Sequence, residues 1–177
     1  MTALVIPTSP VLAMRGGIRR QIPRRSARAA LLGMTTLLAM VSCGGGVPEP
    51  AALDTRNEPC ASCRMAVSSA VFASQLVAPV ELPRFFDDLG CLGDFLKAGK
   101  APEGAVAFVA DHRTKAWVRA DRAVYTRVPG LETPMGSHVI AHADTASRDG
   151  DPDARTGAPV APSELFGPGG PPVGATK

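Results

Sequence analysis

The stretch Cys60-Ala-Ser-Cys63-Arg64-Met65 places two thiols and a thioether within six residues of a chain that has four cysteines in all. The two thiols can close a disulfide, act as a redox couple or hold a metal ion, and each of these states constrains how the surrounding chain folds. Thiolates and thioethers are soft donors, and soft donors suit Cu(I) better than Mg²⁺ or Ca²⁺. The remaining sequence must decide between these outcomes.

Residues 1–42 have the pattern of a signal peptide with a lipobox. A basic segment at Arg24–Arg28 precedes the apolar run Ala29–Val41, which is too short to span a membrane. Met40-Val41-Ser42-Cys43 resembles a bacterial lipobox, in which Cys43 is lipidated and becomes the new N-terminus. Each buried acyl CH₂ contributes about 0.8 kcal/mol to membrane anchoring. Plain secretory cleavage and a short anchor helix are the alternatives. We therefore expect a lipoprotein of the cell envelope that faces the periplasm or the exterior.

The charge of the chain depends on this leader. Without residues 1–42 the chain keeps 13 basic and 16 acidic residues and has no basic block, which disfavours nucleic-acid binding. Residues 43–58, rich in Pro and Ala, are predicted to form a flexible tether. Residues 59–166 are predicted to form the folded body, and the Gly/Pro-rich residues 167–177 a disordered tail.

The body alternates short strand patterns with one clear helix, which predicts an α+β fold of small antiparallel sheets and short helices. The strand patterns lie near 71–77, 81–86, 106–110, 115–119 and 139–141. Leu89, Leu92, Phe95 and Leu96 form one apolar face of a helix that Asp87 or Asp88 can cap.

A second sulfur lies in the loop Thr133-Pro134-Met135-Gly136-Ser137-His138. A methionine in a turn is poorly placed as core filler, whereas Pro134 fixes the backbone and Gly136 permits a sharp bend. Such a loop can hold the Met135 thioether at a fixed point. His138 is a further candidate ligand. Met65 and Met135 each precede a strand, which hints at two related halves.

Other polar and thiol groups have simpler interpretations. Cys91 is expected to be a small, half-buried core residue. His112 is expected to be a polar turn residue, and His142, at a strand end, is a weaker candidate ligand than His138. Asp149–Asp153 lacks the spacing of an EF-hand, so a solvated loop or frayed helix is expected there.

Four kinds of site compete for the two thiols of Cys60 and Cys63. Structural zinc usually needs a second Cys pair or a His pair, which the sequence lacks. Thioredoxin-like chemistry needs a helix after the pair, and a strand-like run follows instead. A structural disulfide leaves Met65 and Met135 unexplained. Cu(I), held by thiolates and thioethers at low coordination number, accounts for more of the pattern.

Four short motifs occur in the same order as in the NosL family of copper-binding lipoproteins, which accompany nitrous-oxide reductase. They are Cys60-Ala-Ser-Cys63-Arg64-Met65, Phe86-Asp87-Asp88-Leu89-Gly90-Cys91, Lys115-Ala116-Trp117-Val118 with Ala123-Val124-Tyr125, and Thr133-Pro134-Met135-Gly136. The chain resembles this family over about residues 58–166. The resemblance implies Cu(I) binding, delivery to an extracytoplasmic copper enzyme and two ββαβ-like halves. The family typically has glycine where this chain has Arg64.

We therefore expect a membrane-anchored Cu(I) chaperone, rather than an enzyme, that delivers copper to a client metalloenzyme such as nitrous-oxide reductase. Cys63, Met65 and Met135 are the first ligand candidates, followed by Cys60 and His138. Asp87 and Asp88 suit helix capping or support of the ligands better than ligation of a soft ion. The alternative is a thiol–disulfide oxidoreductase or thiol sensor that uses Cys60 and Cys63.

Overall fold

The computed structural model describes residues 46–174. The predicted leader with its lipobox, including Cys43, and the last three residues of the predicted tail lie outside this range. Among the helices of residues 46–174, none combines the length and the apolar character needed to cross a bilayer.

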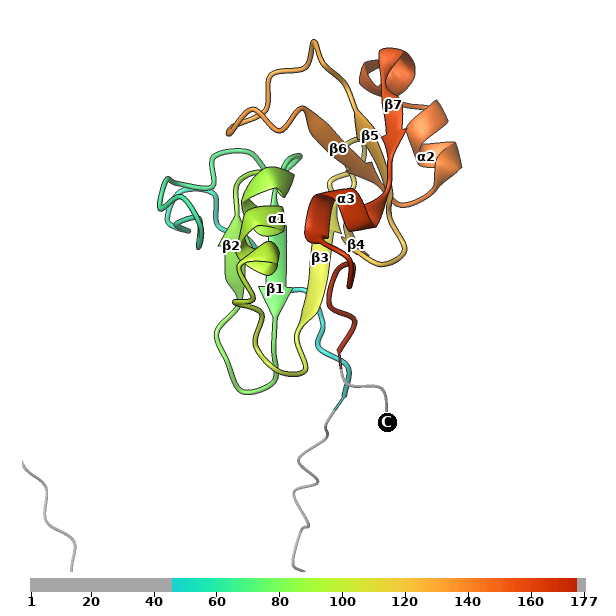
Figure 1. The fold of residues 1–177 in the computed structure, drawn as a ribbon. Helices are drawn as coiled ribbons and strands as arrows, with labels where there is room; N and C mark the ends of the chain where they lie inside the picture. Colours follow the sequence, from blue (N-terminus) through green and yellow to red (C-terminus); the bar gives the residue numbers. More distant parts are fainter. Residues whose placement is uncertain (1–45, 175–177) are drawn as a thin grey trace, which may run out of the picture. The chain divides into compact units, whose positions relative to one another are not determined.

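The first half of the fold is a four-stranded antiparallel sheet with one helix on it. Its strands are β1 (Ser74–Val77), β2 (Arg84–Phe86), β3 (Val106–Ala110) and β4 (Trp117–Arg119), in the spatial order β2-β1-β3-β4. Helix α1 (Leu89–Lys97) connects β2 to β3 and packs on β1 and β2 (Figure 1). Of its predicted apolar face, Leu89 and Leu92 are buried, and Phe95 and Leu96 are partly buried against the same core. The chain leaves the helix through Gly99, whose φ is +67°.

The second half is a three-stranded antiparallel sheet with short helices. Its strands are β5 (Val124–Arg127), β6 (Val139–His142) and β7 (Ala158–Val160), in the order β6-β5-β7. Helix α2 (Thr145–Asp149) and the 3₁₀ helix η1 (Pro152–Thr156) connect β6 to β7. Helix α3 (Pro162–Phe166) follows β7 and packs against α1.

The two halves share one topology. In each half the first strand lies between the second and the third, and the helical connection runs from the second strand to the third. Strand β4 is an addition to the first sheet. The predicted α+β class is therefore confirmed, and both halves have the expected ββαβ order.

The same capping device starts the main helix of each half. Asp88 follows the end of β2 by two residues and accepts a hydrogen bond from the Gly90 amide at the start of α1. Asp144 follows the end of β6 by the same interval and accepts one from the Ser147 amide in α2. A side-chain oxygen at this position satisfies an amide that the helix leaves unpaired.

The two halves are joined through one core and through the end of β3. Phe86, Leu92, Val109, Tyr125 and Ala141 are buried in the same apolar cluster, although they come from both sheets. Beyond β3, the His112 amide donates to the Ala141 carbonyl of β6 at 2.8 Å. The residues that follow β3 and those of β6 are therefore held in register.

Three segments are more ordered than the sequence suggests. In the predicted tether, Ala51 exchanges two hydrogen bonds with the buried Gln75 side chain. In the predicted tail, Gly174 donates to the Ala105 carbonyl, so that residues 172–174 extend the sheet beside β3. Residues 144–155, expected to be a solvated loop or frayed helix, form α2 and η1 with Asp151 buried at 3% exposure. Polar composition misleads at these places because hydrogen bonds to distant residues satisfy the backbone and side chains.

Candidate metal centre

The turn that carries the first two thiols is closed by its own backbone. The Cys60 amide donates to the Met65 carbonyl at 2.7 Å, and the Arg64 amide donates to the Cys60 carbonyl at 3.0 Å. The Ala61 amide donates to the Phe85 carbonyl of β2 at 2.8 Å. The turn is therefore fastened to β2, and it directs its sulfurs toward the end of that strand.

The structure brings four potential ligands together at this place. Their donor atoms, which belong to Cys60, Cys63, Asp87 and Cys91, all lie within 4.8 Å of one another. The Cys63 thiol donates to Asp87 Oδ1 at 3.5 Å. Cys63 is half-buried and the other three residues are buried. None of the three cysteines within residues 46–174 forms a disulfide. This group, hereafter the cysteine cluster, could hold a metal ion.

The sequence predicts Cys91 as a half-buried core residue, and the structure buries it more completely and places its sulfur among other potential ligands. It belongs to the apolar core at 5% exposure, yet its sulfur joins the cysteine cluster. It lies in the first turn of α1, directly after the strand–cap segment that contains Asp87. Apolar periodicity could not reveal this role. The odd number of thiols left after Cys43, together with the position of Cys91 beside the predicted cap, was the available signal.

Burial keeps two of the thiols protonated in the metal-free protein. Burial raises the pKa of the Cys60 thiol, and backbone N–H groups of Cys63, Asp87 and Ser62 offset the rise only in part. Burial also raises the pKa of Cys91, and the nearby Cys60 and Asp87 raise it further. A cation in the cluster would reverse this preference, because it stabilises the thiolates and displaces their protons.

The Met135 loop is held against α1 by one carboxylate. Asp88 uses Oδ1 to cap the helix, whereas its Oδ2 accepts from Thr133 Oγ1 at 2.6 Å and from the Met135 amide at 3.0 Å. Burial disfavours the charge of Asp88, but hydrogen bonds from Ser137, Thr133, Gly90 and Met135 outweigh it and lower the pKa. In Figure 1 the loop between β5 and β6 (orange) reaches across to the start of α1. The loop therefore belongs to the same end of α1 as Cys91.

The turn at Met135 has the conformation that its sequence predicts. The Gly136 amide donates to the Thr133 carbonyl at 3.0 Å, and Gly136 has a φ of +70°. Space is open around Gly136, so its backbone conformation is what favours glycine there. Met135 lies at the tip of this turn and is 46% exposed.

Of the other predicted ligands, Met65 shares the closed turn with Cys60 and Cys63, and His138 is not part of the cysteine cluster. Met65 follows Cys63 in the closed turn and is 58% exposed. His138 is in the Met135 loop, but it is not part of the cysteine cluster, and its Nδ1 bonds to the Leu131 carbonyl at 2.7 Å. Its Nε2 remains the atom with which it could reach an ion.

Comparison of the chain with protein-family models, with curated proteins and with solved structures finds no match. Three thiols and a carboxylate, of which only Cys63 is half-buried and the rest are buried, gather at the start of α1, where the charge of thiolates is favoured. Such a set is suited to a thiophilic cation.

Arg64 occupies a backbone conformation that favours glycine, since its φ is +69°. An L side chain in this region costs roughly 1–2 kcal/mol, and glycine avoids most of that cost. The Arg64 side chain also lines a surface hollow of about 500 Å³, together with Arg84 and Lys100.

We expect Arg64→Gly to raise the free energy of unfolding by about 1 kcal/mol relative to Arg64→Ala. Urea denaturation of both variants measures the difference. Arg64→Ala is the matched control, because it removes the charged side chain but keeps a Cβ atom and therefore the strain of the positive φ. Equal stability of the two variants would contradict the assigned conformation.

Proposed function

We propose that this protein is a membrane-anchored, extracytoplasmic Cu(I) chaperone that delivers copper to a client metalloenzyme. The observation that carries the proposal is the convergence of Cys60, Cys63, Asp87 and Cys91 within 4.8 Å, next to a methionine loop tied to the same helix end. Thiolates and thioethers together select Cu(I) among biological cations.

The candidate ligands differ in solvent exposure, and this difference supports transfer of a copper ion to a partner rather than its storage. Cys60 is fully buried, Cys63 is half-buried, and the thioethers of Met65 and Met135 are exposed. A Cu(I) ion held between Cys63 and the two thioethers could be reached by a partner without opening the core. Soft ligands that can be exchanged one at a time suit passage of the ion from one protein to another.

The runner-up function, thiol–disulfide exchange, is less well supported. A reactive cysteine is usually a low-pKa thiolate, whereas burial raises the pKa of Cys60, one member of the pair. Cys63 is followed by a closed turn and an isolated bridge at Ala66, whereas a redox pair of this spacing usually starts a helix.

Zinc is the competing ion, because three thiolates and a carboxylate can complete a tetrahedral site. Thioethers distinguish the two ions, since Cu(I) accepts them readily and Zn²⁺ prefers thiolate, imidazole and carboxylate. The contribution of Met135 to binding is therefore the decisive measurement.

We expect the reduced protein to take up one Cu(I) per chain, with an affinity tighter than micromolar, in anaerobic competition with a Cu(I) chelator. Met135→Ala should weaken Cu(I) binding by about tenfold or more, equal to about 1.4 kcal/mol. Its effect on Zn²⁺ affinity should be small.

Leu82→Ala is the matched control, because Leu82 is another exposed apolar side chain, at 87% exposure, and lies outside the site. Affinity weaker than micromolar would refute the copper proposal. Thiol–disulfide activity that survives Met135→Ala but is lost in Cys63→Ser would favour the redox alternative.

Asp88 positions the Met135 loop without being a ligand itself. We expect Asp88→Ala to weaken Cu(I) binding, because the loop loses its bonds to the start of α1. The same change removes the cap of α1, which costs about 1 kcal/mol of stability. Asp144→Ala, which removes the equivalent cap of α2, is the control for this general loss. Equal Cu(I) affinities of the two variants would contradict the positioning role.

The proposed anchor is a lipid on Cys43, which would hold the body at a membrane facing the periplasm or exterior. A nitrous-oxide reductase is the client that the resemblance suggests.

We expect Cys43→Ser to move the protein from the membrane to the soluble fraction, as measured by fractionation of cells. Retention of this variant at the membrane would argue against lipidation.

A further inference from the structure

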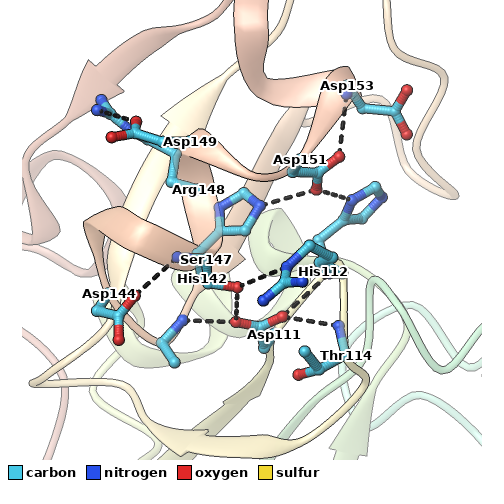
Figure 2. A network of polar contacts seen from close by, with 12 residues as sticks. Asp111, His112, Thr114, His142, Asp144, Ser147, Arg148, Asp149, Asp151 and Asp153 are labelled. Carbon is cyan, nitrogen blue, oxygen red and sulfur yellow. Dashed lines mark hydrogen bonds and ion pairs between the residues drawn. The ribbon is translucent and has the colours of Figure 1, made fainter.

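A second group of ligating side chains lies in the other half of the fold. His112, which follows β3, and His142, the last residue of β6, both bond to the same carboxylate oxygen of Asp151 (Figure 2). The distances are 2.8 Å from His112 Nδ1 and 2.9 Å from His142 Nε2 to Asp151 Oδ2. The three donor atoms lie within 4.8 Å of one another.

We propose that His112 Nδ1, His142 Nε2 and Asp151 Oδ2 form a binding site for a divalent cation that prefers imidazole ligands, with Zn²⁺ as its representative. Two imidazoles and one carboxylate are a common ligand set for such ions, and a water molecule can take the fourth position. The site is independent of the copper proposal, since it shares no residue with the cysteine cluster.

The three residues are held in place by separate supports. The His112 amide bonds to the Ala141 carbonyl, directly before His142. Asp111 fixes the turn after β3, because its Oδ1 accepts from the Arg113 and Thr114 amides while its Oδ2 accepts from the Ala143 amide and Ser147 Oγ. Preorganisation of this kind reduces the entropy lost when an ion binds.

Asp151 is also fixed independently of the histidines. It caps η1, since its Oδ1 accepts from the Asp153 amide at 3.0 Å. Its other oxygen, Oδ2, is thereby directed at the two rings. Asp151 thus accepts a backbone hydrogen bond with Oδ1, and its Oδ2 remains available as a metal ligand.

The surroundings of the site are largely dry. His142 is fully buried and Asp151 is 3% exposed, whereas the side chain of His112 is 9% exposed and gives the route of entry. The Phe72 ring packs on His112 with the centroids 5.3 Å apart. The charged residues around the site include Asp111 and Arg113, which both bond to Ser147, and Asp153, whose amide bonds to Asp151. A buried carboxylate between two imidazole rings in such a place favours a cation.

Each histidine directs one ring N–H at Asp151. His142 donates through Nε2–H and His112 through Nδ1–H to the same oxygen. His142 Nδ1 is buried and has no hydrogen-bond partner among residues 46–174. The neutral imidazole, with its lone pair directed at the ion, is the form that ligates metal ions.

Binding of the ion changes both tautomers in opposite senses. The ion replaces the proton on Nε2 of His142 and the proton on Nδ1 of His112, so that each ring then carries its proton on the other nitrogen, Nδ1 of His142 and Nε2 of His112. The new Nδ1–H of His142 lacks an acceptor in the described chain, which weakens the site relative to a centre whose histidines are both supported. We therefore expect exchangeable binding in the micromolar range.

Long-range ¹H–¹⁵N NMR of the full-length protein, titrated with Zn²⁺, tests the proposal without any substitution. The expected result is the opposite tautomer change of His112 and His142 at micromolar Zn²⁺. Unchanged tautomers at saturating Zn²⁺ would overturn the site and leave a purely structural His–Asp–His contact.

Co²⁺ separates this site from the cysteine cluster. Nitrogen and oxygen ligands give visible d–d bands without sulfur charge transfer, here called the d–d component. A thiolate site also gives d–d bands, but at longer wavelength and together with intense near-ultraviolet charge-transfer bands. We expect Asp151→Asn to lower the affinity for the d–d component at least tenfold while Cu(I) affinity is unchanged. Asp144→Asn is the matched control, because Asp144 is also a helix cap but has no histidine partner.

Two further variants make the outcome decisive. His112→Gln changes the most exposed member of the site and should also remove the d–d component. Cys63→Ser, which weakens the cysteine cluster, should leave it intact. Loss of the d–d bands in Cys63→Ser, or their persistence in both His112→Gln and Asp151→Asn, would place the ion elsewhere and overturn the proposal. Failure of Cu(I) binding, in contrast, would leave these results unaffected.

Discussion

Both halves of this protein depend on buried carboxylates that divide their two oxygens between near and distant partners. Asp88 caps α1 with one oxygen and holds the Met135 loop with the other. Asp111 fixes its own turn and reaches the start of α2, and Asp151 caps η1 and reaches two histidines. A buried charge is tolerated only when it is fully hydrogen-bonded. The requirement to satisfy each carboxylate therefore fixes where the loops lie.

Potential ligands gather near the end of the second strand in each of the two similar halves. In the first half, the junction between strand and helix carries Asp87 and Cys91, and the closed turn at Cys60 brings two more thiols to it. In the second half, the last residue of β6 is a histidine, and its partners come from the end of β3 and from η1. One topology thus presents a soft set of donors in one half and a harder set in the other. These sets differ in the cations they prefer.

The cysteine cluster with its neighbouring methionines and the histidine group differ in how far their side chains are buried. The thiols of Cys60 and Cys91 lie in the core, where burial raises their pKa values and keeps them protonated. The thioethers of Met65 and Met135 remain at the surface, where no pKa limits them as ligands. The histidine site is enclosed on most sides and can be reached only past His112. The two places therefore differ in access, because Met65 and Met135 are exposed to solvent whereas the histidine group is reached past His112.

The sequence by itself determined the features that depend on neighbours along the chain. Apolar periodicity predicted α1 and a continuous apolar run predicted β3. The pair Asp87–Asp88 predicted a cap, which Asp88 supplies, and the Pro–Met–Gly order predicted the turn at Met135. Only the tertiary structure decided which distant side chains meet. Cys91 joined the cysteine cluster, and His112, His142 and Asp151 came together from three elements, because strand pairing and buried carboxylates bring these segments into contact. Local pattern carries no information about such contacts, since they depend on how the two halves pack.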